Sequence, residues 1–459
     1  MSRRRPTPLH PLVRSERVRE AAQALVEAVQ EEAADRVFEP AAYARAIAEL
    51  ERVRGRPLLA PALTSGVGRG ARVWLADGTV KLDFVSGIGV HAFGHGERDL
   101  LETAVTAAAT DVVFQGHLNP GPEYLRLSRL LQRAAGRRLR HVWLSVSGSD
   151  ANENALKMIF QKHAPADRIV AFERGFHGRT AAMAEISDRP GFRDGQPLRG
   201  GVLYVPFYDP DDELSTERSV AALDQHLRRY PGRVAGMVFE LIQGEGGFHT
   251  APREFFAALM EHCKEKGIAI WVDEVQTFAR TGELFAFQAL GLQERVDVVT
   301  IGKAFQGSAV LYTKAYNPRP GLVAGTFAGS TVGMAVAARI LERLESENYL
   351  GPDGRIAVLG RRIEKRFESL RKRMPRTVGP RSGMGAMHAF VPFDGSADLA
   401  RAVLDAAWEE GLILLTAGSG LTKIRLLPPF NTTDEELEAS FNMLEKALRR
   451  VAEERGLPC

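Results

Sequence analysis

The chain has 459 residues, of which 45% are hydrophobic and 25% are charged, and its formal net charge is +3. These values are typical of a globular protein of two or three domains with a large core. So small a net charge does not favour a nucleic-acid or membrane partner. No segment approaches the roughly 18 apolar residues of a membrane span. The only cysteines, Cys263 and Cys459, form no metal-binding motif.

No apolar core of a signal peptide follows the basic run Arg3–Arg5. We therefore expect a short disordered tail and a cytoplasmic location. Residues 1–60 are polar, with apolar residues at helical spacing between Ala21 and Val29, which predicts an N-terminal helical segment. Strand-like segments follow at Val73–Leu75 and Val80–Phe84. We expect residues 61–99 to contribute these strands to a small domain.

Between residues 100 and 330, short apolar runs alternate with helical stretches. The runs are His141–Val146, Ile169–Phe172, Val202–Val205, Ala235–Leu241, Ile268–Val272, Val296–Ile301 and Ala309–Tyr312. This alternation predicts a large α/β domain whose mainly parallel, seven-stranded sheet is covered by helices on both faces. Residues 331–459 predict a smaller C-terminal α+β domain. It has helices at Met334–Asn348, Gly360–Arg373 and Asp434–Glu453, and strands at Met387–Val391 and Lys423–Leu427.

Lys303 lies just after one of these apolar runs and is the only lysine or arginine between Val296 and Tyr312. A lysine at a strand end is suited to forming a Schiff base, because a partly desolvated site lowers the pKa of its amine. Most lysines are solvated surface charges, so local context alone is weak. Asp273, however, ends the run before it, and ligand groups collect at the carboxyl ends of parallel strands.

A lysine that holds an aldehyde and an acid that keeps a pyridine nitrogen protonated are the pair that pyridoxal phosphate requires. Read alone, Asp273 is equally consistent with a helix cap or a surface acid. Ser147, Gly148 and Ser149 follow a strand and open a helix, where backbone N–H groups and small residues can form an anion site. A plain helix cap is the simpler alternative there.

Phe176-His177-Gly178-Arg179 follows the run Ile169–Phe172. An aromatic ring at this position can stack on a pyridine ring, although Phe176 read alone is more consistent with core packing. His177 could act as a general base, but we interpret it as structural.

With these motifs in order, the chain resembles the class III, fold-type I, pyridoxal-phosphate-dependent aminotransferases. Relatives in that family include the acetylornithine, ornithine, 4-aminobutyrate and putrescine aminotransferases. The likeness runs from about residue 73 to about residue 448. It implies that Lys303 carries pyridoxal 5'-phosphate, that Asp273 pairs with its pyridinium nitrogen, and that Ser147, Gly148 and Ser149 hold its phosphate.

The resemblance implies further cofactor contacts. Val275 should pack on the ring face opposite Phe176, and Gln276 should reach the phenolic oxygen. Thr326 matches a threonine that reaches the phosphate of the neighbouring subunit, which implies a homodimer with shared active sites. Read alone, Val275 would be core, Gln276 a solvated amide and Thr326 an ordinary loop residue.

The same resemblance implies a substrate side. Arg425 matches an arginine that binds a substrate carboxylate through a bidentate pair. Glu245 matches an acid that neutralises this arginine when the substrate has no carboxylate there. Arg179 matches an arginine that can hold a distal carboxylate. For each of the three, a surface ion pair is the alternative.

Several segments depart from the family pattern. Thr277–Gly282 is one residue shorter than usual, and Leu241 replaces a proline after Glu240. The segment Ala304–Ser308 has a single glycine, Gly307, where a glycine-rich sequence is common. The loop after Thr326 lacks the usual Gly-Gly-Asn-Pro. None of these changes removes a cofactor group, and together they predict a reshaped substrate pocket.

The implied activity is transfer of an amino group from an amino acid or amine, with a distal amine preferred, to a 2-oxo acid such as 2-oxoglutarate or pyruvate. It would follow a ping-pong scheme. The main alternative is a racemase or epimerase on the same scaffold, which needs the same cofactor residues. A cofactor-binding protein without catalysis is a third reading, against which the intact Lys303 and Asp273 argue.

Overall fold

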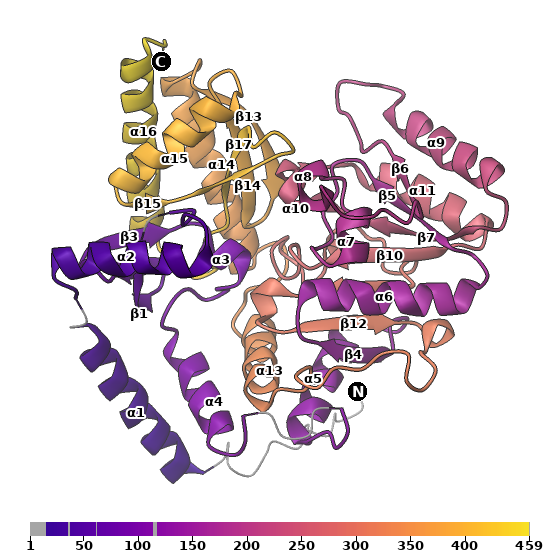
Figure 1. The fold of residues 1–459 in the computed structure, drawn as a ribbon, viewed down its shortest axis with the longest axis horizontal. Coiled ribbons are helices and arrows are strands. Elements are labelled where there is room, and N and C mark those ends of the chain that lie inside the picture. The colour runs from indigo at the N-terminus through magenta and orange to yellow at the C-terminus, as the bar shows by residue number, and fades with distance from the viewer. Residues whose placement is uncertain (1–14, 35–36, 61, 113–116, 459) are drawn as a thin grey trace.

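A seven-stranded sheet organises the larger lobe of the computed structural model (Figure 1), which describes residues 15–34, 37–60, 62–112 and 117–458. Its strands are β4 (His141–Ser145), β5 (Arg168–Phe172), β6 (Val202–Val205), β7 (Val234–Phe239), β10 (Ala269–Glu274), β11 (Val298–Ile301) and β12 (Ser308–Tyr312). They lie in the order β4-β12-β11-β10-β7-β5-β6. β12 runs antiparallel to both neighbours, and the other pairs are parallel. The predicted runs and the mainly parallel sheet are confirmed, whereas the basic run Arg3–Arg5 lies outside the described residues.

Both faces of this sheet are buried, because alternate residues of each strand enter different cores. In β10, Ile270 and Val272 belong to one hydrophobic cluster, and Ala269 and Trp271 belong to another. Helix α6 (Gly148–His163) lies across one face (Figure 1), and helix α11 (Arg253–Glu265) contributes Phe255, Phe256 and Leu259 to the core on the other. Continuous apolar strands are therefore explained by burial on two sides.

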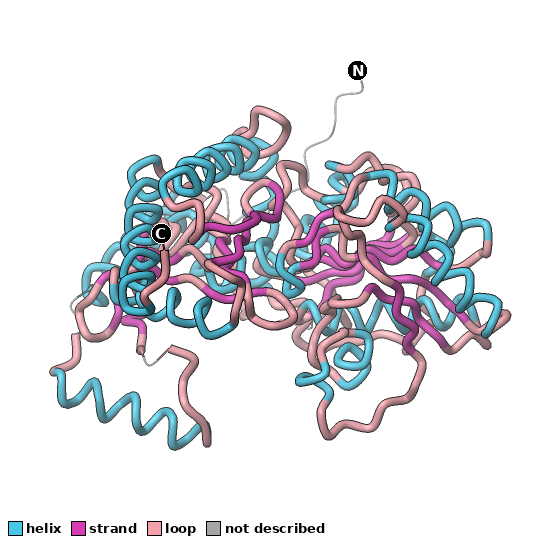
Figure 2. The backbone as a smooth tube through the Cα atoms, turned by 90° about the horizontal axis from the view of Figure 1, so that it is seen from above, coloured by secondary structure: helices cyan, strands magenta, loops and turns pink. Residues whose placement is uncertain are grey.

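The smaller lobe contains a four-stranded antiparallel sheet in the order β13-β14-β17-β16. Its strands are β13 (Val378–Met384), β14 (Met387–Pro392), β17 (Lys423–Leu426) and β16 (Leu415–Ala417). Helices α14 (Arg355–Arg373), α15 (Ala397–Glu409) and α16 (Asp434–Arg455) accompany it. In Figure 2 the strands fall into two groups, one in each lobe.

Strands from the N-terminal part of the chain join the C-terminal part. Strands β1 (Thr64–Arg69), β2 (Arg72–Leu75) and β3 (Val80–Asp83) form a sheet that β15 (Leu412–Ile413) completes, with Leu82 opposite Leu412. Helix α1 (Glu16–Ala34) matches the predicted N-terminal helix, and α2 (Pro40–Arg54) follows it. Strands β1 and β13 were not predicted, because their glycine-rich sequences lack an alternating apolar pattern. The predicted domain boundaries remain predictions.

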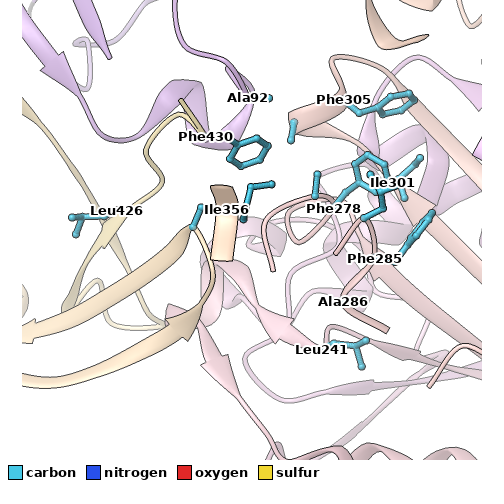
Figure 3. Close-up of a cluster of buried hydrophobic side chains, with 14 of the residues drawn as sticks. Ala92, Leu241, Phe278, Phe285, Ala286, Ile301, Phe305, Ile356, Leu426 and Phe430 are labelled. Atoms are coloured by element: carbon cyan, nitrogen blue, oxygen red, sulfur yellow. The ribbon is translucent and has the colours of Figure 1, made fainter. Parts of the chain in front are cut away.

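Aromatic packing fills the region where the two lobes meet. Phe278 makes edge contacts with Phe285 and Phe305, at centroid distances of 5.2 and 5.7 Å. Phe430 donates its backbone N–H to the carbonyl of Ala92 at 2.7 Å. Figure 3 shows Phe430 and Ile356 between the group around Phe278 and the small-lobe residue Leu426. Residues distant in sequence therefore share one core, which fixes the lobes beside the carboxyl edge of the large sheet.

The helices of the described chain do not include one that is both long and apolar enough to cross a bilayer.

Candidate active site

The predicted site residues gather at the carboxyl ends of the central strands. Asp273 lies near the end of β10, opposite Thr300 of β11, and Lys303 lies two residues after the end of β11. A cavity of about 190 Å³ opens at this edge. Its lining includes the predicted residues Ser147, Gly148, Ser149, Phe176, Glu245, Asp273, Val275, Gln276 and Lys303. The arrangement follows from the parallel topology, since the carboxyl ends of parallel strands share one edge.

Lys303 enters the cavity from a strained backbone. It begins the short 3-10 helix η2 (Lys303–Phe305) with a φ of 51°, and Gln306 at the end of this turn has a φ of 53°. Left-handed backbone costs a non-glycine residue roughly 1–2 kcal/mol, and such strain is concentrated at functional sites. Burial lowers the pKa of the Lys303 amine to about 8, although the charge of Glu245 opposes this shift. The amine therefore has a substantial neutral, nucleophilic fraction near pH 8.

Three donors hold the buried carboxylate of Asp273. Its Oδ2 accepts hydrogen bonds from Nδ2 of Asn152 and Nδ1 of His177, both at 2.8 Å, and its Oδ1 accepts from the backbone N–H of Val275 at 3.0 Å. Burial lowers the pKa of His177, but the hydrogen bond and charge of Asp273 outweigh it, so this pKa lies above its usual range. A protonated His177 balances the carboxylate's charge, and the set orients Asp273 toward the cavity.

Asn152 was missed by sequence reasoning. It lies one helical turn after Ser149 on α6, and its amide also donates to the carbonyl of His177 at 2.7 Å. The available signal was this spacing from the Ser147–Ser149 motif, which turns Asn152 toward the sheet. His177, interpreted as structural from sequence, is the charged partner of Asp273 in the structure.

The phosphate end of the predicted site is the N-terminus of α6. Ser147 is the N-cap residue, and its Oγ accepts from the backbone N–H of Asp150 at 3.1 Å. A Cβ added to Gly148 would lie 2.6 Å from Val275, and one added to Gly178 would lie 2.3 Å from Oγ of Ser149. Only glycine permits these approaches, which leave the positive end of the helix dipole facing the cavity.

Between the two ends, the cavity has apolar walls and a free polar atom. Phe176 and Val275 both line it, and the Phe176 ring packs edge-on against Phe192 at 5.6 Å. The Oε1 atom of Gln276 is buried and finds no hydrogen-bond partner among the described residues. An anion site, apolar walls, an unpaired amide oxygen, a buried carboxylate and a lysine together fit pyridoxal phosphate.

A buried ion pair closes the substrate side. Nη1 of Arg425, on β17, lies 2.5 Å from Oε1 of Glu245, on the short helix α10 (Gly244–Gly247). The arginine side chain is 3% exposed and the glutamate 21%. Burial raises the pKa of Glu245, but the adjacent Arg425 outweighs it and holds this pKa below the usual range. Nε2 of Gln276 lies 3.4 Å from the same oxygen, which links the pair to the cofactor side.

Glu240 is a third acid at the cavity, after Asp273 and Glu245, and sequence reasoning did not assign it to the site. It accepts hydrogen bonds from the backbone N–H groups of Phe176 at 2.8 Å and Gly244 at 3.1 Å. Burial raises its pKa to about 7, although the positive charge of His177 opposes the shift. Glu240 therefore links the Phe176 loop to helix α10, and its position in the Glu240–Gln243 motif was the available signal.

Arg425 contacts the cavity lining through Glu245, and two further predicted residues also lie outside the lining. Arg179 is exposed, and its guanidinium stands 4.5 Å above the ring of Phe192. Thr326 is also exposed, next to the exposed Phe327. Their roles toward a distal carboxylate and a neighbouring subunit stay predictions.

The shortened segment Thr277–Gly282 closes through an unusual backbone. Ala279 has a φ of 60°, where glycine is the favoured residue, and its N–H donates to the carbonyl of Leu284 at 2.8 Å. Arg280 is fully buried, and its Nη1 donates to the backbone carbonyls of Ala386 and Pro428, both at 3.3 Å. The segment therefore connects the end of β10 to the small lobe.

Within the described part of the chain, no group of three His, Cys, Asp or Glu side chains could hold a metal ion.

Comparison with known proteins identifies the family. The family described as aminotransferase class III matches residues 60–448. A 2-aminoadipate transaminase of Pseudomonas putida is 34% identical over 420 residues, which cover 85% of this chain and 96% of the relative. A probable 4-aminobutyrate aminotransferase of Bacillus subtilis is 32% identical and covers 83% of this chain and 92% of its own. The solved lysine aminotransferase of M. tuberculosis superposes with a TM-score of 0.78 at 25% identity, over 88% of this chain and 99% of that one.

The chain belongs to the class III aminotransferases. It is a fold-type I, pyridoxal-phosphate-dependent enzyme that transfers an amino group from an amino donor to a 2-oxo acid. The relatives named above are all aminotransferases, and nothing in the comparisons favours the racemase alternative.

The lowered pKa of Lys303 is testable in the cofactor-free protein. Labelling of Lys303 by an amine-directed acylating reagent should rise with pH to a midpoint near 8, because burial favours the neutral amine. Exposed lysines provide the internal reference, with a midpoint near the ordinary value of about 10.4. Peptide mass spectrometry across a pH series measures both. A Lys303 midpoint that coincides with the exposed lysines would contradict the inference.

Proposed function

We propose that this aminotransferase takes donors with a distal amino group, either amino acids or amines, and passes that group to an acceptor such as 2-oxoglutarate or pyruvate in two half-reactions. The buried Arg425–Glu245 pair beside Lys303 carries the proposal. A donor that brings no carboxylate to Arg425 meets an arginine already neutralised by Glu245. Relatives named for 4-aminobutyrate and lysine, both of which bear a distal amine, support this donor class.

The residues at the sheet edge would divide the cofactor's binding and chemistry among them. When bound, pyridoxal phosphate supplies an aldehyde that condenses with amines and a ring that accepts the electron pair released at the donor carbon. Lys303 would hold that aldehyde and then carry the proton between carbons. Asp273, with His177 and Asn152 behind it, would keep the ring nitrogen protonated.

The remaining contacts follow from the cavity lining. The N-terminus of α6, at Ser147–Ser149, would bind the phosphate. Phe176 and Val275 would pack on opposite faces of the ring and fix its plane, and Gln276 would bond its phenolic oxygen.

The two half-reactions make different demands on Arg425. A 2-oxo acid brings a carboxylate, and the arginine can bind it only if the Glu245 side chain moves away. The same movement would admit donors with an α-carboxylate, such as the substrate for which the 2-aminoadipate transaminase is named. We infer that the position of Glu245 sets which donors are accepted. Arg179 would serve a distal carboxylate only if its exposed side chain turned inward from Phe192.

We also propose a homodimer with shared active sites, in which Thr326 reaches the phosphate site of the partner. Uncovered apolar side chains around the phosphate end support this assembly. Val146, next to Ser147, and Phe327, next to Thr326, are 56% and 66% exposed and line one surface depression. Exposed apolar patches of this kind mark protein–protein contacts.

The role of Asp273 is tested by Asp273→Asn. The amide keeps the shape of the side chain but removes its charge, so pyridoxal phosphate should still bind while proton abstraction slows by orders of magnitude, because an unprotonated ring nitrogen accepts the released electron pair less well. Single-turnover absorbance changes measure the rate, and His177→Asn separates loss of the partner from loss of the carboxylate. A near-normal single-turnover rate in Asp273→Asn would refute the role.

The ion pair predicts opposite effects from its two members. Arg425→Ala should impair the oxo-acid half-reaction most, by on the order of 2–5 kcal/mol for a truncated charged pair. Glu245→Ala should leave Arg425 unpaired and shift preference toward donors with an α-carboxylate. Separate half-reaction rates for 2-oxoglutarate, an amino acid and a simple amine measure both effects. Equal losses for Arg425→Ala in both half-reactions, with unchanged preference in Glu245→Ala, would show a structural pair.

Shared sites predict recovery of activity in mixed dimers. Co-expression of Lys303→Ala with Thr326→Asp should give hybrids in which one site carries both changes and the other carries neither. The hybrid, isolated through two different tags, should therefore have about half the activity of the native dimer, since a single intact site remains. A hybrid without activity would place Thr326 and Lys303 of each site in the same subunit, and a fully active monomer would exclude shared sites altogether.

A further inference from the structure

Arg189 joins the two segments that carry the Arg425–Glu245 pair. Arg189 lies between α7 (Ala181–Ile186) and α8 (Pro190–Arg193), and it is 9% exposed. Helix α8 lies beside α10 in Figure 1. Its Nη2 donates to the backbone carbonyl of Glu245, and its Nη1 donates to the carbonyl of Gly418 at 2.9 Å. The N–H of Gly418 donates to the same Glu245 carbonyl at 3.0 Å. The guanidinium therefore fastens α10 to the turn that precedes β17.

One donor of this guanidinium is unused. The Nε–H of Arg189 is buried and has no hydrogen-bond partner in the described part of the chain, although buried polar groups are nearly always paired. The other two nitrogens bond main-chain carbonyls, and no carboxylate of a described residue forms a close ion pair with this guanidinium. Burial lowers the pKa of Arg189, and the charge of Glu245 is the strongest opposing influence. The unused donor is thus buried within electrostatic reach of the Glu245 side chain.

The carboxylate of Glu245 needs a partner in both half-reactions. While it pairs with Arg425, its charge is compensated. When a substrate carboxylate occupies Arg425, the displaced Glu245 carboxylate remains in a largely buried site, and an unpaired buried charge is strongly unfavourable. A cation already bonded to the backbone of Glu245 offers compensation without movement of the main chain.

We propose that Arg189 is the second partner of Glu245: when Arg425 binds a substrate carboxylate, the Glu245 side chain turns to the free Nε–H of Arg189. This inference rests on the proposed function of the Arg425–Glu245 pair and deepens it. Arg189 then acts as a positioning residue that lets one site accept substrates with and without a carboxylate at Arg425. No proton transfer is involved, since the carboxylate exchanges one guanidinium for another.

The affinity of glutarate tests the inference apart from catalysis. Glutarate carries the carboxylates of 2-oxoglutarate but has no oxo group, so it can bind the holoenzyme without reacting. Arg189→Gln keeps an amide donor for the backbone carbonyls but removes the charge, and it should raise the Kd of glutarate about tenfold, equivalent to about 1.4 kcal/mol. The KM for 2-oxoglutarate should rise in parallel with little change in kcat. The half-reaction of a simple amine, which leaves Glu245 on Arg425, should be nearly unchanged.

A double-mutant cycle separates this role from a structural one. In a Glu245→Ala background no carboxylate needs a second partner, so Arg189→Gln should change the Kd of glutarate less than about twofold. A tenfold loss that persists in that background would show that Arg189 acts only through the fold and would overturn the proposal. Arg189→Lys, which keeps the charge, should restore part of the affinity. If Arg189→Gln fails to fold, the same cycle is run with Arg189→Lys, whose loss of affinity should likewise vanish in the Glu245→Ala background.

Two further variants complete the experiment: Arg168→Gln as a matched control, and Arg425→Ala as a test of the carboxylate clamp itself. Arg168 also donates to a backbone carbonyl, that of Gly200 at 2.6 Å, and its buried Nε also makes no hydrogen bond to a described residue, although Oδ1 of Asp167 lies 3.9 Å away. This arginine lies at the start of β5. Arg168→Gln should leave the Kd of glutarate unchanged. Unchanged glutarate affinity in Arg425→Ala would overturn the carboxylate clamp and this proposal together. A normal response of Arg425→Ala with no effect of Arg189→Gln would overturn the role of Arg189 alone.

Discussion

The buried carboxylate of Asp273 is the constraint on which the larger lobe depends. A charge in this position is tolerated only if it is paired and hydrogen bonded, and its partners come from helix α6, from the loop after β5 and from its own strand end. These elements must therefore converge on one point, which is also where the sheet opens into the cavity. The network orients the carboxylate and brings the phosphate end of α6 to a fixed place relative to Lys303.

The Arg425–Glu245 ion pair differs from the network around Asp273, because its two residues come from different lobes. Glu245 belongs to the segment that follows β7, whereas Arg425 belongs to β17 of the small lobe. The proposed cofactor-binding groups thus arise from the large sheet, and the proposed substrate-binding groups arise where the lobes meet. Changes in the connecting segments, such as the shortened Thr277–Gly282 segment, can reshape the substrate side while the cofactor side is kept.

Much of this arrangement could be predicted from the sequence, and the features that could not be predicted were missed for physical reasons. The central strands were recognisable because burial on both faces requires continuous apolar runs. Their ends then indicated Lys303 and Asp273, and the family resemblance implied the other site residues. Strands β1 and β13 carry no such pattern, because glycine and polar residues form them beside well-marked neighbours. Asn152, Glu240 and Arg189 were missed as site residues because their partners are distant in sequence. For Asn152 and Glu240 the only local signal was their spacing from neighbouring motif residues, and Arg189 had none.

Division of the site between lobes has a mechanical consequence. A ligand that contacts Arg425 and Lys303 together spans two bodies that meet along an aromatic core around Phe278 and Phe430, so a small rotation of one body changes the separation of its two anchors. Part of the free energy of binding a carboxylate would then appear as tightening or loosening of that joint. Substitutions in the aromatic core between the lobes, although remote from any ligand, would therefore change the length of substrate that the enzyme prefers.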